Sequence, residues 1–310
     1  MNTPHLLSSL SRSQLQDRLF GDGLDLLIPP FAVRVQSRID VVAEGLACLY
    51  ADYQIPPFRG TGFSDFHVSL LSCRRWFRPL CAFQLDGVQP FTPLALSEAF
   101  ALFEWGLNWC VTSHCHQWVT LHAAVLERDG RAVILPAPPG SGKSTLCAAL
   151  MFRGWRLLSD ELTLLEPESG LVMPCPRPVS LKNISIDVIR ERAPDCTIGP
   201  IAHDTQKGTV AHLKVSHDSL LRAGERALPG WIVFPRYERG APLDVRVRAK
   251  SAALLDLARN SFNQHVHGRT GFQALARLVD TCDSFDLRYS QLDQAMVWFD
   301  ALEPPTAGWA

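Results

Sequence analysis

The sequence has almost no net charge and no long apolar run. Its 310 residues contain 30 Lys and Arg against 31 Asp and Glu, a formal net charge of −1. This balance argues against a strongly basic protein, so we expect no nucleic-acid partner. An uncharged apolar run of about 18 residues is also missing, so we expect no transmembrane helix and no membrane partner. The nearest candidate, residues 94–111, is interrupted by Glu98 and Glu104.

Secretion signals and paired cysteine motifs are missing too. Residues 1–10 have neither a basic region nor a long apolar core, which is not typical of a signal peptide. The nine cysteines are odd in number and include no Cys-x-x-Cys, so a disulfide framework is not indicated. We expect reduced, mostly buried thiols in a cytoplasmic protein.

The composition is that of a globular protein, with 47 % hydrophobic and 20 % charged residues. The length suggests about two domains of roughly 100–200 residues each. The pattern changes at Trp118, so we place a boundary near residue 115. We expect a smaller α+β region of unassigned role over residues 1–115, and an α/β nucleotide-binding domain over residues 116–310.

Periodicity predicts the elements of both regions. In the first, we expect a helical lead over 1–30, and then strands and helices at 31–39, 41–53, 66–73, 76–85 and 97–112. In the second, Asp129-Gly130 predicts a hairpin of strands 119–127 and 131–136. Strands at 156–165, 170–173, 231–235 and 243–247 and helices at 251–260, 271–283 and 290–302 follow. Residues 177–213, with three prolines, are expected to form a long irregular loop.

The most informative stretch is APPGSGKST, residues 137–145. It matches the phosphate-binding pattern G-x-x-x-x-G-K-[ST] except that Ala137 replaces the first glycine. An apolar strand precedes it and a helix follows it, which is the required context. Glycines let successive N–H groups turn toward phosphate oxygens, and the helix N-terminus adds partial positive charge. We therefore expect ATP to be bound by Pro139, Gly140, Ser141, Gly142, Lys143, Ser144 and Thr145, with the Ser144 hydroxyl on Mg²⁺.

The next acidic pair is Asp160-Glu161. The intervening helix, 144–153, is roughly 15 Å long at about 1.5 Å per residue. The returning strand, 155–160, covers roughly 16–20 Å at about 3.3 Å per residue. In a right-handed β–α–β unit these lengths nearly cancel, so Asp160 should return to the level of Ser144 as a base or magnesium ligand. The alternative is a solvated acidic pair at a strand end.

His122 lies on the strand before the hairpin and shares one face with Thr120 and Ala124. If that strand neighbours the one leading into the phosphate loop, His122 lies at the catalytic edge. The alternative is a structural histidine.

Together these residues resemble the HPr kinase/phosphorylase family, and in particular its subgroup of HprK-related kinases A. The matching segment is LHAAVLERDGRAVILPAPPGSGKSTLCAALMFRGWRLLSDELTLL, about 45 residues. A looser resemblance continues through RPVSLK at 177–182 and KGTVAHL at 207–213. Two departures are visible: Glu161 stands where the family has a second Asp, and the family's glycine-rich signature has no counterpart.

The resemblance implies an α/β kinase core of the phosphoenolpyruvate-carboxykinase-like type, with ATP and Mg²⁺ as cofactors and a serine hydroxyl as acceptor. It implies that Asp160 is the general base and that His122 assists or orients the acceptor. Mg²⁺ would be held by Ser144 and an acidic residue, for which Glu161 is our candidate. Arg177, Lys182 and Lys207 are candidate phosphate or acceptor contacts, with ordinary solvated cations as the alternative.

The leading hypothesis is an ATP-dependent kinase whose hydroxyl acceptor is a peptide, a carrier protein or a small molecule. The alternative is a nucleotide-dependent regulatory module with slow or no phosphoryl transfer, in which ATP orders residues 177–213 for a partner. A third hypothesis, a kinase-derived protein without catalysis, is disfavoured by the intact Lys143, Ser144 and Asp160. The acceptor, the choice of ATP or GTP, phosphorylase activity, a homo-oligomeric state and the role of residues 1–115 stay open.

Overall fold

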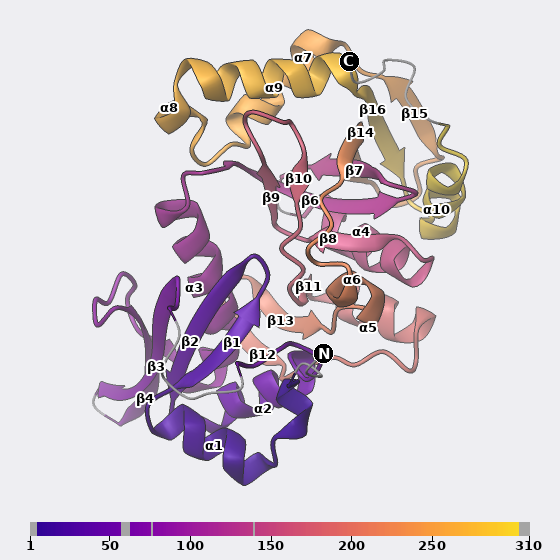
Figure 1. The fold of residues 1–310 in the computed structure, drawn as a ribbon. Coiled ribbons are helices and arrows are strands. Elements are labelled where there is room, and N and C mark those ends of the chain that lie inside the picture. Colours follow the sequence, from indigo (N-terminus) through magenta and orange to yellow (C-terminus); the bar gives the residue numbers. More distant parts are fainter. Residues whose placement is uncertain (1–4, 57–62, 76, 139, 304–310) are drawn as a thin grey trace. The chain divides into compact units, whose positions relative to one another are not determined.

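The computed structural model describes residues 5–56, 63–75, 77–138 and 140–303 of a mixed α/β chain (Figure 1). The chain forms two compact units. The first comprises Met1–Val111 with Ser180–Leu220, and the second comprises Thr112–Val179 with Leu221–Ala310. Our division near residue 115 placed all later residues in one domain, whereas here residues 180–220 group with the N-terminal ones.

The first unit contains a five-stranded sheet in the order β1-β2-β3-β4-β5. Its strands are β1 (Leu24–Ile28), β2 (Phe31–Ser37), β3 (Phe66–Arg75), β4 (Arg78–Leu85) and β5 (Leu94–Ala95). Its helices are η1 (Leu7–Ser9), α1 (Arg12–Phe20), α2 (Asp40–Leu49), η2 (Leu96–Glu98) and α3 (Ala99–His114). The helical lead predicted over 1–30 is wrong after Phe20, because Leu24, Leu26 and Ile28 alternate into the core as β1.

Residues 180–220 are folded, so the predicted irregular loop over 177–213 is wrong. They form β11 (Val179–Lys182), α5 (Ile184–Arg192), β12 (Ala202–Thr205), β13 (Gly208–Leu213) and α6 (His217–Leu221), with the strands in the order β11-β13-β12. Ala202 and Val210 pack with Ala101 and Trp105 of α3. This burial orders a segment whose own apolar periodicity is weak.

The second unit contains an eight-stranded sheet. Its main order is β10-β9-β6-β7-β14-β16-β15, and β8 also pairs with β6. The strands are β6 (Val119–Arg128), β7 (Arg131–Pro136), β8 (Arg156–Ser159), β9 (Leu162–Leu165), β10 (Val172–Met173), β14 (Leu228–Tyr237), β15 (Asp244–Val247) and β16 (Asp283–Tyr289). The predicted hairpin is confirmed: β6 and β7 pair antiparallel, and Asp129 and Gly130 both have positive φ. The sequence analysis missed β16.

Strand directions in this sheet place one end of several strands together. β7 and β14 are parallel, as are β14 and β16. β6 is antiparallel to both β7 and β8, so β7 and β8 run in the same direction with β6 between them. The carboxyl ends of β7, β8, β14 and β16 therefore meet at one edge, which is where α/β sheets bind ligands.

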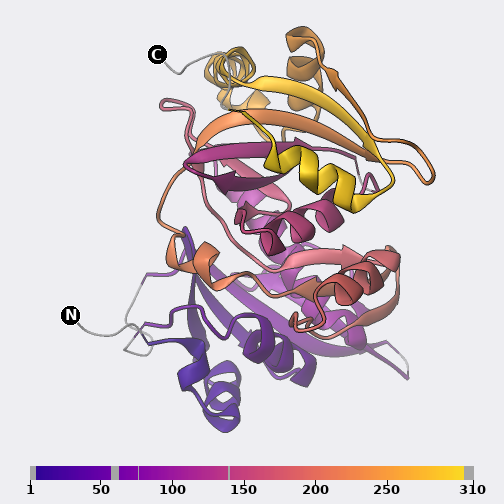
Figure 2. The ribbon, with the colours of Figure 1, turned by 90° about the vertical axis from the view of Figure 1, so that its right-hand side faces the viewer.

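Helices cover both faces of this sheet (Figures 1 and 2). They are α4 (Lys143–Phe152), α7 (Lys250–Arg259), α8 (Gln264–His267), α9 (Arg269–Thr281) and α10 (Leu292–Asp300). On one face, Leu121 and Val125 of β6 share an apolar cluster with residues of α7 and α9. α4 and α10 lie on the other face, in contact with each other. In the described part of the chain, no helix has the length and apolar character required to cross a membrane.

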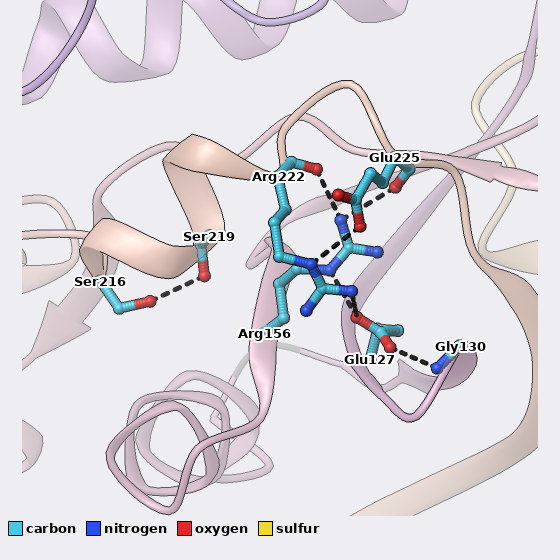
Figure 3. Close-up of polar contacts among 7 residues, drawn as sticks. All are labelled: Glu127, Gly130, Arg156, Ser216, Ser219, Arg222 and Glu225. Atoms are coloured by element: carbon cyan, nitrogen blue, oxygen red, sulfur yellow. Dashed lines mark hydrogen bonds and ion pairs between the residues drawn. The ribbon is translucent and has the colours of Figure 1, made fainter.

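A buried ion-pair network lies at the hairpin end of β6 (Figure 3). The Nε of Arg156 donates to Glu127, and its Nη1 donates to the carbonyl oxygens of Arg222 at 2.7 Å and Glu225 at 2.9 Å. Glu127 also accepts from the N–H of Gly130 in the hairpin turn. The Arg156 and Glu127 side chains are 2 % and 1 % exposed, so their charges are compensated by each other, and that of Glu127 also by Arg222 at 3.3 Å, and not by water.

We expect Arg156→Met to lower the free energy of unfolding by about 3–5 kcal/mol, because it leaves a carboxylate and two carbonyls without this partner in the interior. Urea unfolding measures the loss. The control is Arg246→Met, whose guanidinium is 74 % exposed in its pair with Asp244 and should contribute less than about 1 kcal/mol. Equal losses for the two variants would contradict this account.

Asp300 joins the ends of three elements. It accepts hydrogen bonds from Arg128 at 2.8 Å, at the end of β6, and from Arg153, just after α4. Partial burial by itself would raise the pKa of Asp300, but the hydrogen bonds and charges of the two arginines outweigh it and lower the pKa below 3.8. The ionised carboxylate thus stabilises the folded unit.

Because the folded-state pKa is lowered, this stabilisation is present above the unfolded pKa and is lost as pH falls through the folded pKa. We expect Asp300→Asn to reduce the free energy of unfolding above about pH 5 and to have progressively less effect in more acidic solution. Denaturant titrations across this range test the expectation. Asp280→Asn, which alters a 74 % exposed carboxylate, is the control. A penalty for Asp300→Asn that does not change with pH would rule out the charge effect.

Candidate functional site

The loop between β7 and α4 curls at two glycines. Gly140 and Gly142 have φ values of +84° and +86°, in the left-handed region that favours glycine. Gly142 is the N-cap of α4, and its carbonyl accepts the first helical hydrogen bond, from Leu146 N–H at 3.0 Å. Pro139 lies outside the described residues. The strand, turn and helix thus follow in the order required for N–H groups to face an anion.

Two tyrosines at neighbouring strand ends hold this loop. Tyr237, at the end of β14, donates its backbone N–H to the Ser141 carbonyl at 2.9 Å. Tyr289, at the end of β16, donates its hydroxyl to the Gly142 carbonyl at 3.3 Å. Burial, together with the neighbouring Tyr237, raises the pKa of Tyr289, so its hydroxyl stays a donor. The sequence analysis missed both residues.

The loop residues suit a phosphate chain. Lys143 opens α4 and is only 7 % exposed. The Ser141 hydroxyl is covered by protein and has no hydrogen-bond partner among the described residues. Ser144 and Thr145 follow in the first turn, each half-buried. A buried cation, an unsatisfied hydroxyl and a helix N-terminus together favour an anionic ligand.

The described residues provide few protein ligands for Mg²⁺ near this loop. In the parts of the chain that the structure covers, no group of three or more His, Cys, Asp or Glu side chains could hold a metal ion. Mg²⁺ commonly takes one or two protein ligands and completes its shell with water and phosphate oxygens. Ser144 and one carboxylate fit that pattern.

Asp160 and Glu161 lie where a predicted strand is interrupted. The strand expected over 156–165 is two strands, β8 and β9, both antiparallel to β6. The pair forms the bend between them. Asp160 is 4 % exposed and Glu161 is half-buried. The pairs Ser159–Val125 and Leu162–His122 are three residues apart on both strands, so no residue is inserted at the bend, and the two carboxylates come from successive positions at the carboxyl end of β8.

Asp160 lies near the buried thiol of Cys147 in α4. This thiol is fully buried, one turn after Lys143. Burial raises the pKa of Cys147 well above its ordinary value, the charge of Asp160 and a hydrogen bond to that carboxylate raise it further, and Lys143 opposes the rise. Lys143 and Asp160 lie close enough to one buried atom to act on it electrostatically.

His122 lies beside the start of the phosphate loop. The next residue on β6, Ala123, pairs with Pro136 at the end of β7. His122 itself pairs with Leu162 at the start of β9, and its N–H donates to the Asn260 carbonyl at 2.7 Å. Its ring centroid is 6.0 Å from that of Phe262. His122 thus occupies the edge at which Asp160 and the loop also lie.

The three candidate cations are divided between the units. Arg177 belongs to the second unit, with the loop, and is 8 % exposed. Lys182 and Lys207 belong to the first unit. Lys207 lies over the Trp105 ring, with its Nζ 4.7 Å from the ring centroid, so it has a local structural contact. For Arg177, burial makes an ordinary solvated cation the poorer interpretation.

Comparison with known proteins gives little sequence likeness. No protein-family model matches the chain, and no curated protein matches it either. Among solved structures, the Hpr(Ser) kinase/phosphatase from Coxiella burnetii is similar over 58 % of this chain and 95 % of its own, with 14 % identity and a TM-score of 0.25. At that TM-score the likeness carries no argument about fold or activity.

Alanine substitution should have different effects on stability at the two loop glycines. An added Cβ at Gly140 meets nothing within 4 Å, whereas one at Gly142 lies 2.7 Å from the Tyr289 hydroxyl and 2.9 Å from the Tyr237 Cβ. We expect Gly140→Ala to lower the free energy of unfolding by roughly 1–2 kcal/mol from its left-handed backbone alone. Gly142→Ala should lower it further, because two packed tyrosines must also move. Equal losses in urea unfolding would contradict the close packing.

Proposed function

We propose that this chain is an ATP-dependent kinase of the HPr kinase-like type, which phosphorylates a serine or other hydroxyl of a peptide, protein or small molecule. One observation carries the proposal. Lys143 at the start of α4 and Asp160 at the bend after β8 are both buried, and the strands that lead to them, β7 and β8, run in the same direction on either side of β6 and end at one edge of the sheet. A phosphate-binding lysine and a candidate base thus share one neighbourhood. The sequence resemblance of residues 121–165 gives independent support.

The loop residues would hold the phosphate chain. The N–H groups of the loop and the Lys143 ammonium would neutralise its charge, and in phosphoryl transfer such positioning and neutralisation provide most of the rate enhancement. Ser144 and Glu161 would hold Mg²⁺. Bound Mg·ATP supplies the phosphoryl group and the charge of the metal.

Asp160 would act on the acceptor. Its carboxylate accepts the proton of the attacking hydroxyl while the acceptor oxygen gains the phosphoryl group and ADP leaves. His122, at the same edge, would orient the acceptor. Arg177 would contribute positive charge within the same unit.

Two variants separate binding from transfer. We expect Lys143→Ala to abolish Mg·ATP binding in calorimetry, because the buried ammonium is lost. Asp160→Asn should keep Mg·ATP binding and lower phosphoryl transfer by about 100-fold or more, because the amide cannot accept the proton. Transfer is followed with γ-labelled ATP and a library of serine-containing peptides and small alcohols. Asp280→Asn is the matched control and should alter neither quantity.

The destination of the label distinguishes the hypotheses. Label on an acceptor supports a kinase. Label found only in free phosphate or bound nucleotide favours the regulatory alternative and overturns the kinase proposal. Transfer by Asp160→Asn at the wild-type rate would remove Asp160 from the role of base and leave the phosphate-loop assignment intact.

A further inference from the structure

Tyr237 is a half-exposed aromatic residue built against the candidate phosphate loop. It is 48 % exposed, whereas Tyr289 beside it is 2 % exposed. The two rings pack edge to face, with centroids 5.9 Å apart and an interplanar angle of 73°. The backbone of Tyr237 is fixed by its hydrogen bond to Ser141. Its ring is therefore positioned by the loop and by Tyr289, and still keeps open surface.

Strand alternation gives the side of the sheet on which this ring lies. Tyr237 is six residues after Trp231 on β14, so the two side chains project from the same face. The Trp231 ring is 6.4 Å from that of Trp155, which is 6.1 Å from that of Phe299 in α10. This is the face that carries α4 and α10. Tyr237 therefore lies on the α4 side of the sheet, next to the N-terminus of that helix.

Two cationic neighbours of Tyr237, Arg236 and Arg288, are directed away from this side. Arg236 precedes it on β14 and pairs in register with Arg288 of β16, on the opposite face. There, Arg236 and Arg288 interact with Glu238, and Arg288 also interacts with Asp244. These two guanidinium groups therefore lie on the opposite face from the Tyr237 ring, whose exposed aromatic surface suits a flat ring.

We propose that Tyr237 forms the nucleobase subsite, and that its exposed ring stacks on the purine of a nucleoside triphosphate bound at residues 137–145. This inference rests on the proposed function and extends it to recognition of the base. A single half-exposed aromatic residue is common on protein surfaces. This one differs because its backbone and its packing partner both bond the phosphate loop.

Stacking by one aromatic residue makes a measurable contribution to affinity. Alanine substitution at a base-stacking side chain weakens binding by roughly 5- to 150-fold, and the effect requires only an aromatic ring. We therefore expect Tyr237→Ala to weaken Mg·ATP binding within that range and Tyr237→Phe to retain it. Mg·tripolyphosphate has no base, so its affinity should stay within about two-fold in both variants.

Isothermal calorimetry with these two probes provides the test. Tyr289→Phe removes only the hydroxyl that bonds the Gly142 carbonyl, so it should weaken both probes by the same factor. Phe272→Ala alters another half-exposed aromatic residue, on α9, and should change neither. Tyr237→Leu retains apolar bulk without a ring, and should lose ATP affinity selectively even where Tyr237→Ala is poorly folded.

The outcomes separate the two proposals. Selective loss of ATP affinity in Tyr237→Leu, with recovery in Tyr237→Phe, supports the subsite. An unchanged ATP affinity, or equal weakening of both probes by Tyr237→Leu, overturns the subsite and leaves the phosphate loop in place. Failure of the wild-type protein to bind either probe overturns the proposed function, and the subsite with it.

Discussion

The candidate site depends on one steric constraint: the ends of β14 and β16 lie directly against Gly142. A glycine with positive φ lets the backbone reach within contact of Tyr237 and Tyr289, where no Cβ would fit. The tyrosines then bond two consecutive loop carbonyls. When carbonyls on one side of a turn are satisfied by protein, the opposing N–H groups are left to face a ligand. Packing between strands therefore preorganises the loop.

The buried charged groups of the candidate site lie at the same edge of the sheet in the second unit. Lys143 and Asp160 are both buried, a position that costs free energy unless opposite charge or hydrogen bonds compensate it. Their charges act in opposite directions on the pKa of the buried Cys147 thiol, which Asp160 raises and Lys143 lowers. At the other end of β6, Glu127 and Arg156 form a compensated network of their own. The first arrangement places a buried cation and a buried carboxylate at the candidate site, whereas the second holds the hairpin.

The first unit differs from the second in how its sheet is buried. Its five-stranded sheet alternates buried and mostly half-buried residues along β1 and β2, so one face of these strands packs on the core and the other is partly covered. Residues 180–220 join this unit through small side chains, Ala202 and Val210, packed against α3. Lys182 and Lys207 belong to this unit, although the sequence resemblance associates their segments with the kinase core.

The sequence alone determined those elements whose sequence patterns are contained within a few neighbouring residues. The Asp129-Gly130 hairpin and the glycine-rich turn followed by a helix are examples, because φ preferences and alternation act over short distances. Only tertiary structure decided the rest. β16 is polar enough to be missed and becomes a strand by pairing in parallel with β14. The break at Asp160-Glu161 lies between two strands, β8 and β9, that both pair with β6. Tyr237 and Tyr289 meet Gly142 from positions about 95 and 147 residues along the chain, and contacts at such separation depend on strand order, which no local pattern encodes.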